Sequence, residues 1–287
     1  MLPIKKIYVD SRQRTKDSKS SSDFAIDLPN NLLMPENTVF YVDDVTIPVS
    51  WYNVNENNNN LYIIATVFIN NVGHSHWLRV TIPPANYSTQ SLANQIAIQI
   101  ESAFEPISPQ TVDVTYSVDT LTNNFTIRVP TWTQIIVMDD DEIVGVAPTK
   151  DWGNGPYSSI NRVIGNYVQK EATENWTSGY VNLHSLRNIY IRSSNLGTYS
   201  TMSLRGDRDI IKKVPVNAGP NEVIFNNVMV AQDYLDCSRQ TISRMYFKLE
   251  DVDGNVLDLN YADWSFSLIF AKFDTELSIT FSDLEYI

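Results

Sequence analysis

The sequence predicts an all-β protein, an antiparallel jelly-roll sandwich with an inserted lobe that contains one α-helix. Short segments rich in Val, Ile, Tyr, Phe and Thr recur along the chain between clusters of turn residues, as in sandwiches and jelly rolls. From Trp264 to Phe270, aromatic and apolar side chains alternate with serines, which is typical of a strand with one face on a core. Only one long segment has helical spacing instead.

Fourteen segments have the composition of strands, and strands at this spacing favour antiparallel pairing. They are 4–10, 23–28, 38–51, 61–69, 77–83, 111–118, 124–129, 180–183, 188–193, 209–216, 222–230, 243–251, 255–259 and 263–273. The turn at Asp253-Gly254 predicts a hairpin between 243–251 and a return strand that begins at Val256.

The helix is expected over 87–104, where Leu92, Ile96, Ile100 and Phe104 recur every four residues. Ser88 is the expected N-cap, and Pro106 follows the helix. We expect this helix to pack on the sheet formed by its neighbours.

Loop composition suggests the domain boundaries. The low-complexity run 55–60 and the Gly-, Asn- and Ser-rich run 151–162 are expected loops. We therefore predict a basic N-terminal arm over 1–22, a jelly-roll body over 23–70 and 151–287, and a β-β-α-β-β lobe inserted over 71–150.

Charge is unevenly distributed along the chain. The net charge is -12, which argues against a main surface that binds nucleic acid through its phosphates. Residues 1–20 nevertheless sum to +4, with two acidic residues against six basic ones, and the remainder sums to -16. The basic residues are Lys5, Lys6, Arg12, Arg14, Lys16 and Lys19.

No combination of residues in the sequence predicts catalysis. His74 and His76 would share one face of an extended segment, but no neighbouring Cys or carboxylate completes a metal site, so loop histidines are the favoured interpretation. Cys237 is the only cysteine, which excludes an internal disulfide, and a small buried residue is favoured over a nucleophile. Nucleophile-elbow, P-loop and HExxH motifs are absent. We expect no enzyme activity and no cofactor.

Two acidic runs have carboxylates that could hold a divalent cation. The run 251–255 begins like an EF-hand loop, but Val256 and Ala262 stand where that loop needs Gly and Glu, so a hairpin turn is favoured. The run Asp139–Glu142 suits either a short helix N-terminus or a calcium site between subunits.

Two further features leave alternatives open. Arg205-Gly206-Asp207 is the tripeptide of integrin ligands, although three residues also recur by chance. The 15 Tyr, 11 Phe and 6 Trp suit either contacts between subunits or a Tyr-rich core. No stretch approaches the ~20 apolar residues of a membrane span, so we expect no membrane segment and a protein that is assembled inside a cell.

Six motifs together resemble one family. They are YVDSRQR (8–14), SSSDFAIDLP (21–29), VTIPVSWYNVNENNNNLY (45–62), PANYSTQSLANQI (84–96), RDIIKKVPV (208–216) and WSFSLIF (264–270). In this order they resemble the penton, or minor capsid, proteins of virophages and Polinton-like viruses. The resemblance implies a homopentamer that closes the fivefold vertices of an icosahedral virion, among trimers of a double-jelly-roll major capsid protein. It implies no catalytic residues.

Within that interpretation, the basic arm is expected to be mobile and to order on contact with a partner. Arg12, Arg14, Lys16 and Lys19 would then meet an acidic surface of adjoining capsid subunits or packaged DNA, whereas a solvated loop without a partner is the simpler alternative. Deletion of residues 1–20 is expected to leave a folded pentamer that enters vertices poorly.

Two other functions are alternatives to a vertex protein. A jelly-roll host-attachment protein that reads a glycan would stack exposed Trp and Tyr rings on sugar. A cupin-type metalloenzyme is disfavoured because it needs clustered histidines, and this chain has three in all.

Overall fold

The computed structural model describes residues 3–150, 152, 157–167, 171–184, 186–196, 201–203, 206, 208–228 and 233–272. The chain divides into two compact units, a body made of Met1–Trp51 with Leu186–Ile287, and an inserted unit, Tyr52–Ser185. Among the described residues, every pair of strands is antiparallel. None of the helices in these residues has the length and apolar character that crossing a membrane requires.

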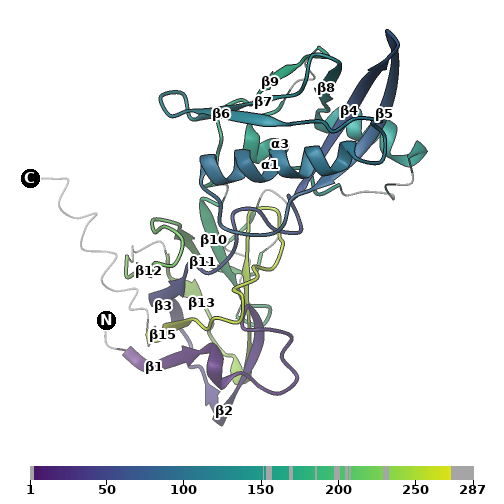
Figure 1. Ribbon diagram of the computed structural model, residues 1–287. Coiled ribbons are helices and arrows are strands. Elements are labelled where there is room, and N and C mark those ends of the chain that lie inside the picture. Colours follow the sequence, from purple (N-terminus) through teal and green to yellow (C-terminus); the bar gives the residue numbers. More distant parts are fainter. Residues whose placement is uncertain are drawn as a thin grey trace, which may run out of the picture. The chain divides into compact units, whose positions relative to one another are not determined.

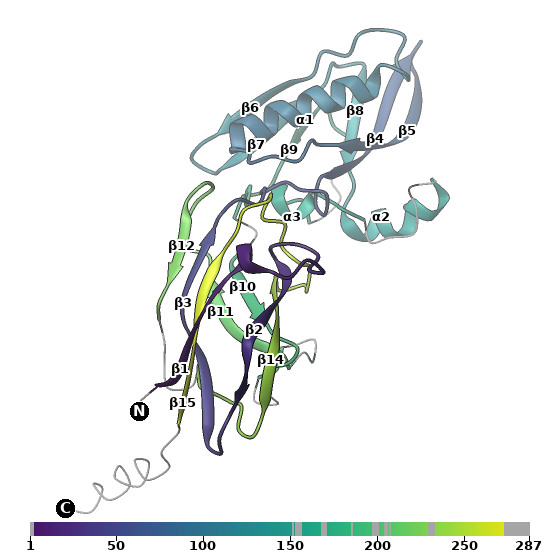
Figure 2. The same ribbon diagram turned by 90° about the horizontal axis from the view of Figure 1, so that it is seen from below.

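The body is a sandwich of two sheets, which Figure 2 shows as two layers. The first, here named the β15 sheet, has the order β1 (Pro3–Asp10), β15 (Ser265–Lys272), β3 (Thr38–Pro48) and β12 (Val223–Asn226), and β13 (Leu235–Asp236) also pairs with β3. The second, the β14 sheet, has the order β11 (Ile210–Pro215), β10 (Asn188–Arg192), β14 (Thr241–Glu250) and β2 (Asp23–Leu33). The first strands of the chain alternate between the sheets, so residues far apart in sequence share one core (Figure 1). The predicted antiparallel sandwich is confirmed.

The core of the body lies between the two sheets and is aromatic at its centre. Trp264 and Phe266 stack with ring centroids 4.8 Å apart, and Phe247 from the β14 sheet meets Phe266 edge-on at 4.9 Å. The alternation predicted from Trp264 to Phe270 is confirmed on the core side, where Trp264, Phe266, Leu268 and Phe270 are all buried. Such offset and edge-on aromatic pairs stabilise a core beyond the area that they bury.

A β-bulge interrupts β3. Phe266 pairs with Val45 and Leu268 pairs with Val42, so the single residue Ser267 lies opposite both Asp43 and Asp44. The buried positions of β3 accordingly run through Val42 and then resume one position out of phase at Val45. The bulge keeps both carboxylates out of the core.

The N-terminal segment is part of the body and does not form a separate arm. Residues 3–10 form β1, which pairs with β15 along its length, and Val9 is buried in the core. The expected arm over 1–22 is therefore wrong for the part that the structure describes. The physical reason is the alternation of Ile7 and Val9, which face the core, with Lys6 and Tyr8, which do not.

The predicted hairpin at 251–255 is reduced to a turn and one bridge. Glu250 and Val256 form an isolated bridge, and the Leu257 amide donates to the Leu249 carbonyl at 3.0 Å. The chain then leaves the β14 sheet, and β15 pairs with β1 and β3 instead. The expected strand 255–259 is thus wrong, and the turn is right.

The inserted unit has two three-stranded sheets and one long helix (Figure 1). One sheet has the order β5 (Val72–Thr81), β4 (Asn60–Ile69) and β8 (Thr133–Val137), and the other has the order β6 (Thr115–Asp119), β7 (Asn124–Arg128) and β9 (Asn175–Thr177). The short helices α2 (Asp140–Val146) and α3 (Asn161–Ile164) and the 3-10 turn η2 (Ala147–Thr149) complete it.

The inserted unit, Tyr52–Ser185, includes more of the chain than the lobe predicted over 71–150. β4 pairs with β5 and β8, so it belongs to this unit and not to the body, because its buried run from Leu61 to Val67 joins the unit's own core. β8 and β9 were not predicted. The expected strand 180–183 is wrong, because Val181 and Asn182 donate to Asn123 and Val163 in place of a strand ladder.

The predicted helix is confirmed as α1 (Thr89–Phe104). Ser88 is its N-cap, and Ser88 and Ser91 form a reciprocal capping box. Leu92, Ile96, Ile100 and Phe104 are fully buried against the unit's sheets. The four-residue spacing therefore identified the buried side of the helix.

Candidate functional site

The basic segment covers the edge of the β14 sheet. Residues 11–22 begin with the 3-10 turn η1 (Ser11–Gln13) and then run beside β2. The amides of Thr15 and Lys19 donate to the carbonyls of Ala25 and Asp23 at 2.9 and 3.0 Å, and Ser18 Oγ accepts from the Ala25 amide. This cover satisfies backbone groups that an edge strand otherwise offers to other chains.

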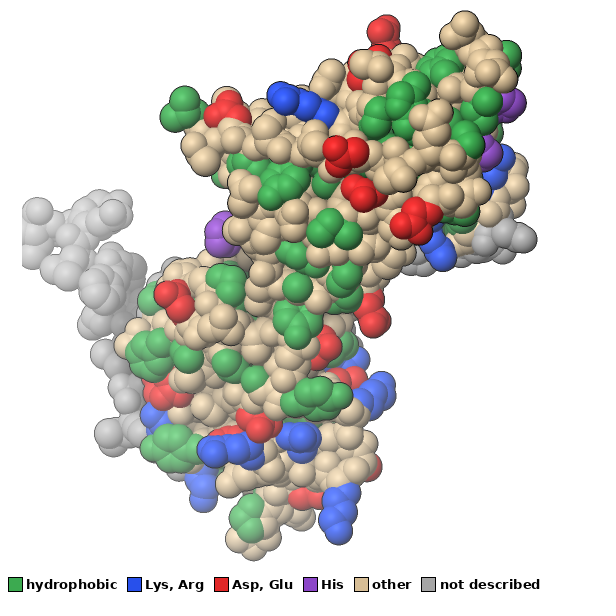
Figure 3. Space-filling view, in the orientation of Figure 1, with side chains coloured by type: hydrophobic (Ala, Val, Ile, Leu, Met, Phe, Trp, Pro, Cys, Tyr) green, Lys and Arg blue, Asp and Glu red, His purple; other side chains and the backbone are tan. Residues whose placement is uncertain are grey.

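Most of the positive charge in this segment is paired. Arg12 contacts Asp10 at 2.5 Å, Arg14 contacts Asp263 at 3.0 Å, and Lys19 contacts Asp23 at 3.4 Å. Hydrogen bonding by Arg12 lowers the pKa of the Asp10 carboxyl, which is therefore ionised at neutral pH. Figure 3 shows Lys and Arg interspersed with Asp and Glu on this view of the body. Lys16 is exposed as well.

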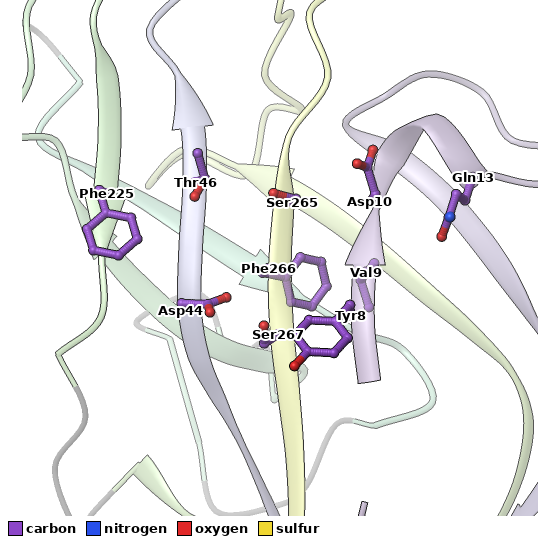
Figure 4. Close-up of a pocket in the computed structure, with 10 residues that line it drawn as sticks. All are labelled: Tyr8, Val9, Asp10, Gln13, Asp44, Thr46, Phe225, Ser265, Phe266 and Ser267. Carbon is purple, nitrogen blue, oxygen red and sulfur yellow. The ribbon is translucent and has the colours of Figure 1, made fainter. Parts of the chain in front are cut away.

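A hollow of about 430 Å³ lies on the outer side of the β15 sheet (Figure 4). One row of directly paired residues crosses all four strands, in the order Asp10, Ser265, Thr46 and Phe225. Tyr8 and Ser267 form the next pair, and Asp44 enters the hollow from the bulge of β3. On the two central strands the lining combines Ser265, Ser267 and Thr46 with Asp44 and Phe266, and on the edge strands β1 and β12 it includes the rings of Tyr8 and Phe225.

The aromatic edges of this hollow are well exposed, whereas its floor is not. Tyr8 is 72% and Phe225 60% exposed, but Ser267 is only 1% exposed although it points away from the core. Lys6 Nζ lies 2.8 Å from Asp43 Oδ2 and 5.2 Å from the centre of the Tyr8 ring, so an ion pair holds a cation beside that ring. No pattern in the sequence predicted this hollow directly. The signal was present in Tyr8, Ser265 and Ser267, which occupy the outward positions of two neighbouring strands.

The two predicted histidine positions lie on a strand and not on a loop. His74 and His76 are on β5, opposite Val67 and Ala65 of β4, with His74 fully on the surface. Within the described residues, no three His, Cys, Asp or Glu side chains gather as a metal site would require.

Cys237 is buried, as expected. Its thiol donates to the Thr38 carbonyl at 3.5 Å, and burial raises the pKa of the thiol to about 12. A thiol that keeps its proton at neutral pH is a poor nucleophile.

Both acidic runs have local structural roles. Asp251 Oδ1 accepts hydrogen bonds from the amides of Asp253 and Asn255 at 2.8 and 2.9 Å, which closes the turn. Asp139 caps α2 by accepting from the Glu142 amide at 2.8 Å, so the helix interpretation of 139–142 is confirmed. Burial, together with the nearby Asp139, raises the pKa of Glu142. In the tripeptide Arg205-Gly206-Asp207, the residues Arg205 and Asp207 lie outside the described residues.

The sandwich body with its inserted unit has the jelly-roll fold of a viral penton protein. The chain is similar to the crystal structure of the selenomethionine-labelled mavirus penton protein, with a TM-score of 0.54 and 12% sequence identity. The similarity covers 94% of this chain and 100% of the other, so it includes both units. No protein-family model and no curated protein matches the sequence. The resemblance predicted from the six motifs is thus confirmed at the level of the fold.

Proposed function

We propose that the protein is a structural capsid protein, a penton that closes the fivefold vertices of an icosahedral virion as a homopentamer. The observation that carries this proposal is the fold shared with the mavirus penton protein over the full length of that chain. A ring of identical subunits needs two different contact surfaces on each copy. Exposed aromatic residues such as Tyr261 on the body and Tyr167 and Tyr180 on the inserted unit suit such contacts.

The proposed partners follow from that position in a shell. A penton meets copies of itself and the surrounding double-jelly-roll major capsid protein, and it is assembled in the host cell. We propose that Arg12, Arg14, Lys16 and Lys19 face an acidic surface of those neighbours. Packaged DNA is the alternative partner. Three of the four cations already have a carboxylate partner, which weakens their attraction to an acidic surface and to phosphate groups alike.

The assembly is tested with the full-length chain by native mass spectrometry and by particle imaging. The expected results are a species of five copies and ring-shaped particles with fivefold symmetry. A chain that stays monomeric at the concentrations of capsid assembly contradicts the proposal, as does turnover of a substrate.

The basic segment is tested by a variant with Arg12, Arg14, Lys16 and Lys19 all changed to Gln. A matched control changes four exposed cations elsewhere, Arg79, Arg128, Lys213 and Arg239, to Gln. Both variants are expected to form the oligomer, and only the first is expected to enter co-expressed capsids poorly. If both variants enter capsids equally well, the basic segment has no role in contacting neighbouring capsid subunits.

A further inference from the structure

The hollow on the β15 sheet offers a ligand side-chain groups and no free backbone. Its floor lies on β15 and β3, which are central strands with a hydrogen-bonded neighbour on each side. An extended peptide that binds by adding a strand needs an edge. This floor therefore does not suit such a peptide, and a ligand must be held through Ser265, Thr46 and the side chains around them, since Ser267 is covered.

The two sides of the hollow carry aromatic surface. Tyr8 on β1 and Phe225 on β12 are both largely exposed, and three strand spacings separate their strands, about 14 Å. Exposed aromatic rings supply apolar contact area at low cost in conformational entropy. A ligand that fits this arrangement has an apolar face and a polar rim.

The polar groups of the hollow are mainly acceptors and hydroxyls. Asp44 and Asp10 contribute carboxylates, Gln13 an amide, and Thr46, Ser265 and Ser267 hydroxyls. An ionised carboxylate accepts two or more hydrogen bonds, so it suits neighbouring hydroxyl groups on one ligand. Within the described part of the chain, Asp44 forms no ion pair, whereas Asp10 and Asp43 are held by Arg12 and Lys6.

We propose that this hollow binds a neutral saccharide, with Tyr8 and Phe225 against the C–H face of the sugar and with Asp44 and the hydroxyls of Ser265 and Thr46 bonded to its hydroxyl groups. Its volume of about 430 Å³ lies in the range of small-ligand sites, which have apolar walls and a few placed polar groups. The carboxylates disfavour sialylated and sulfated sugars through like-charge repulsion.

The test uses the purified full-length chain. An array of neutral oligosaccharides and of their sialylated and sulfated counterparts identifies binders, and titration by calorimetry or NMR then measures Kd. Tyr8→Ala, Phe225→Ala and Asp44→Asn are each expected to weaken binding of a neutral sugar by about tenfold. Tyr246→Ala is the matched control, because Tyr246 is an exposed tyrosine on a strand of the other sheet, and it is expected to leave Kd unchanged.

Thermal unfolding of each variant separates loss of binding from loss of folding, and Tyr8→Phe, which keeps the ring, is expected to retain binding. The proposal is overturned if no neutral saccharide binds saturably, if Tyr8→Ala and Asp44→Asn bind as the parent does, or if sialylated sugars bind equally well. A further result would also overturn the proposal. If the parent protein binds no saccharide and Tyr8→Ala abolishes the oligomer, the hollow is a contact with a second copy of the chain.

Discussion

Arg192 on β10 forms an ion pair with Glu250 on β14, and that carboxylate is only 5% exposed. The same guanidinium reaches Asp209 through its Nε at 2.8 Å. Replacing Arg192 with Met keeps most of the stem but leaves the buried Glu250 carboxylate with only the longer contact to Lys248 Nζ, at 3.9 Å. We expect the free energy of unfolding of the body to fall by about 3–5 kcal/mol in chemical denaturation.

The control for this pair is Arg239→Met. Arg239 contacts Glu36 at 2.6 Å, but both side chains are well exposed, so a loss below about 1 kcal/mol is expected. Similar losses in the two variants contradict the assigned role of burial.

Gly179 and Gly165 approach each other closely in the inserted unit. A Cβ on Gly179 would lie 2.3 Å from the Gly165 carbonyl oxygen, a backbone atom that cannot rotate away. Gly179→Ala is therefore expected to destabilise the unit by about 1–3 kcal/mol or more in a thermal unfolding assay. Gly145→Ala in α2 has open space around the new methyl group and is expected to stabilise the helix by about 0.5–1 kcal/mol. A tolerated Gly179→Ala would show that the two segments can separate.

Cys237 makes stability depend on pH in the alkaline range. Burial raises the pKa of its thiol from 9.0 to about 12, so between these values the unfolded chain releases a proton that the native chain keeps. The free energy of unfolding therefore falls as pH rises through this window. The fall is expected to be shallower in Cys237→Ala, measured by denaturation at several pH values from 8 upward.

Alkylation gives an independent measurement of the same thiol. At pH 8 the native protein is expected to react slowly with iodoacetamide, and the urea-unfolded protein quickly. Rapid reaction of the native protein contradicts the burial of Cys237.

Deletion of residues 1–20 is now expected to disrupt the body. The deletion removes β1, the buried Val9, and the Ser11 amide bond to the Trp264 carbonyl at 2.9 Å. Circular dichroism and thermal unfolding of the deleted chain should show a loss of native structure, whereas the Gln variant of the four cations should unfold as the parent does. Native stability of the deletion variant would contradict this prediction and would support a separate N-terminal arm.

Local patterns in the sequence predicted local structure well. Ser88 with the four-residue spacing gave α1, and the alternation at Trp264–Phe270 gave the core face of β15. The sheet to which each strand belongs was harder to predict, because it depends on pairing between segments that are distant in sequence. β4 reads equally well as a strand of either unit, and only its partners β5 and β8 assign it.

The candidate site was harder to predict for the same reason. Tyr8, Thr46, Phe225 and Ser265 lie far apart in sequence and meet only through the strand order of one sheet. The basic segment was identified by composition. Asp10 and Asp23, which pair with Arg12 and Lys19, are close in sequence, but Asp263, the partner of Arg14, lies 249 residues further along the chain and could not be paired with it from sequence.

The bulge in β3 also disfavours a shifted register between β3 and β15 during folding. If β3 slid by one residue against β15, Asp43 or Asp44 would enter an aromatic interior, where an unpaired carboxylate is strongly disfavoured. The acidic pair at the bulge thus opposes a shifted register that the hydrogen-bonding pattern of the two strands alone would allow.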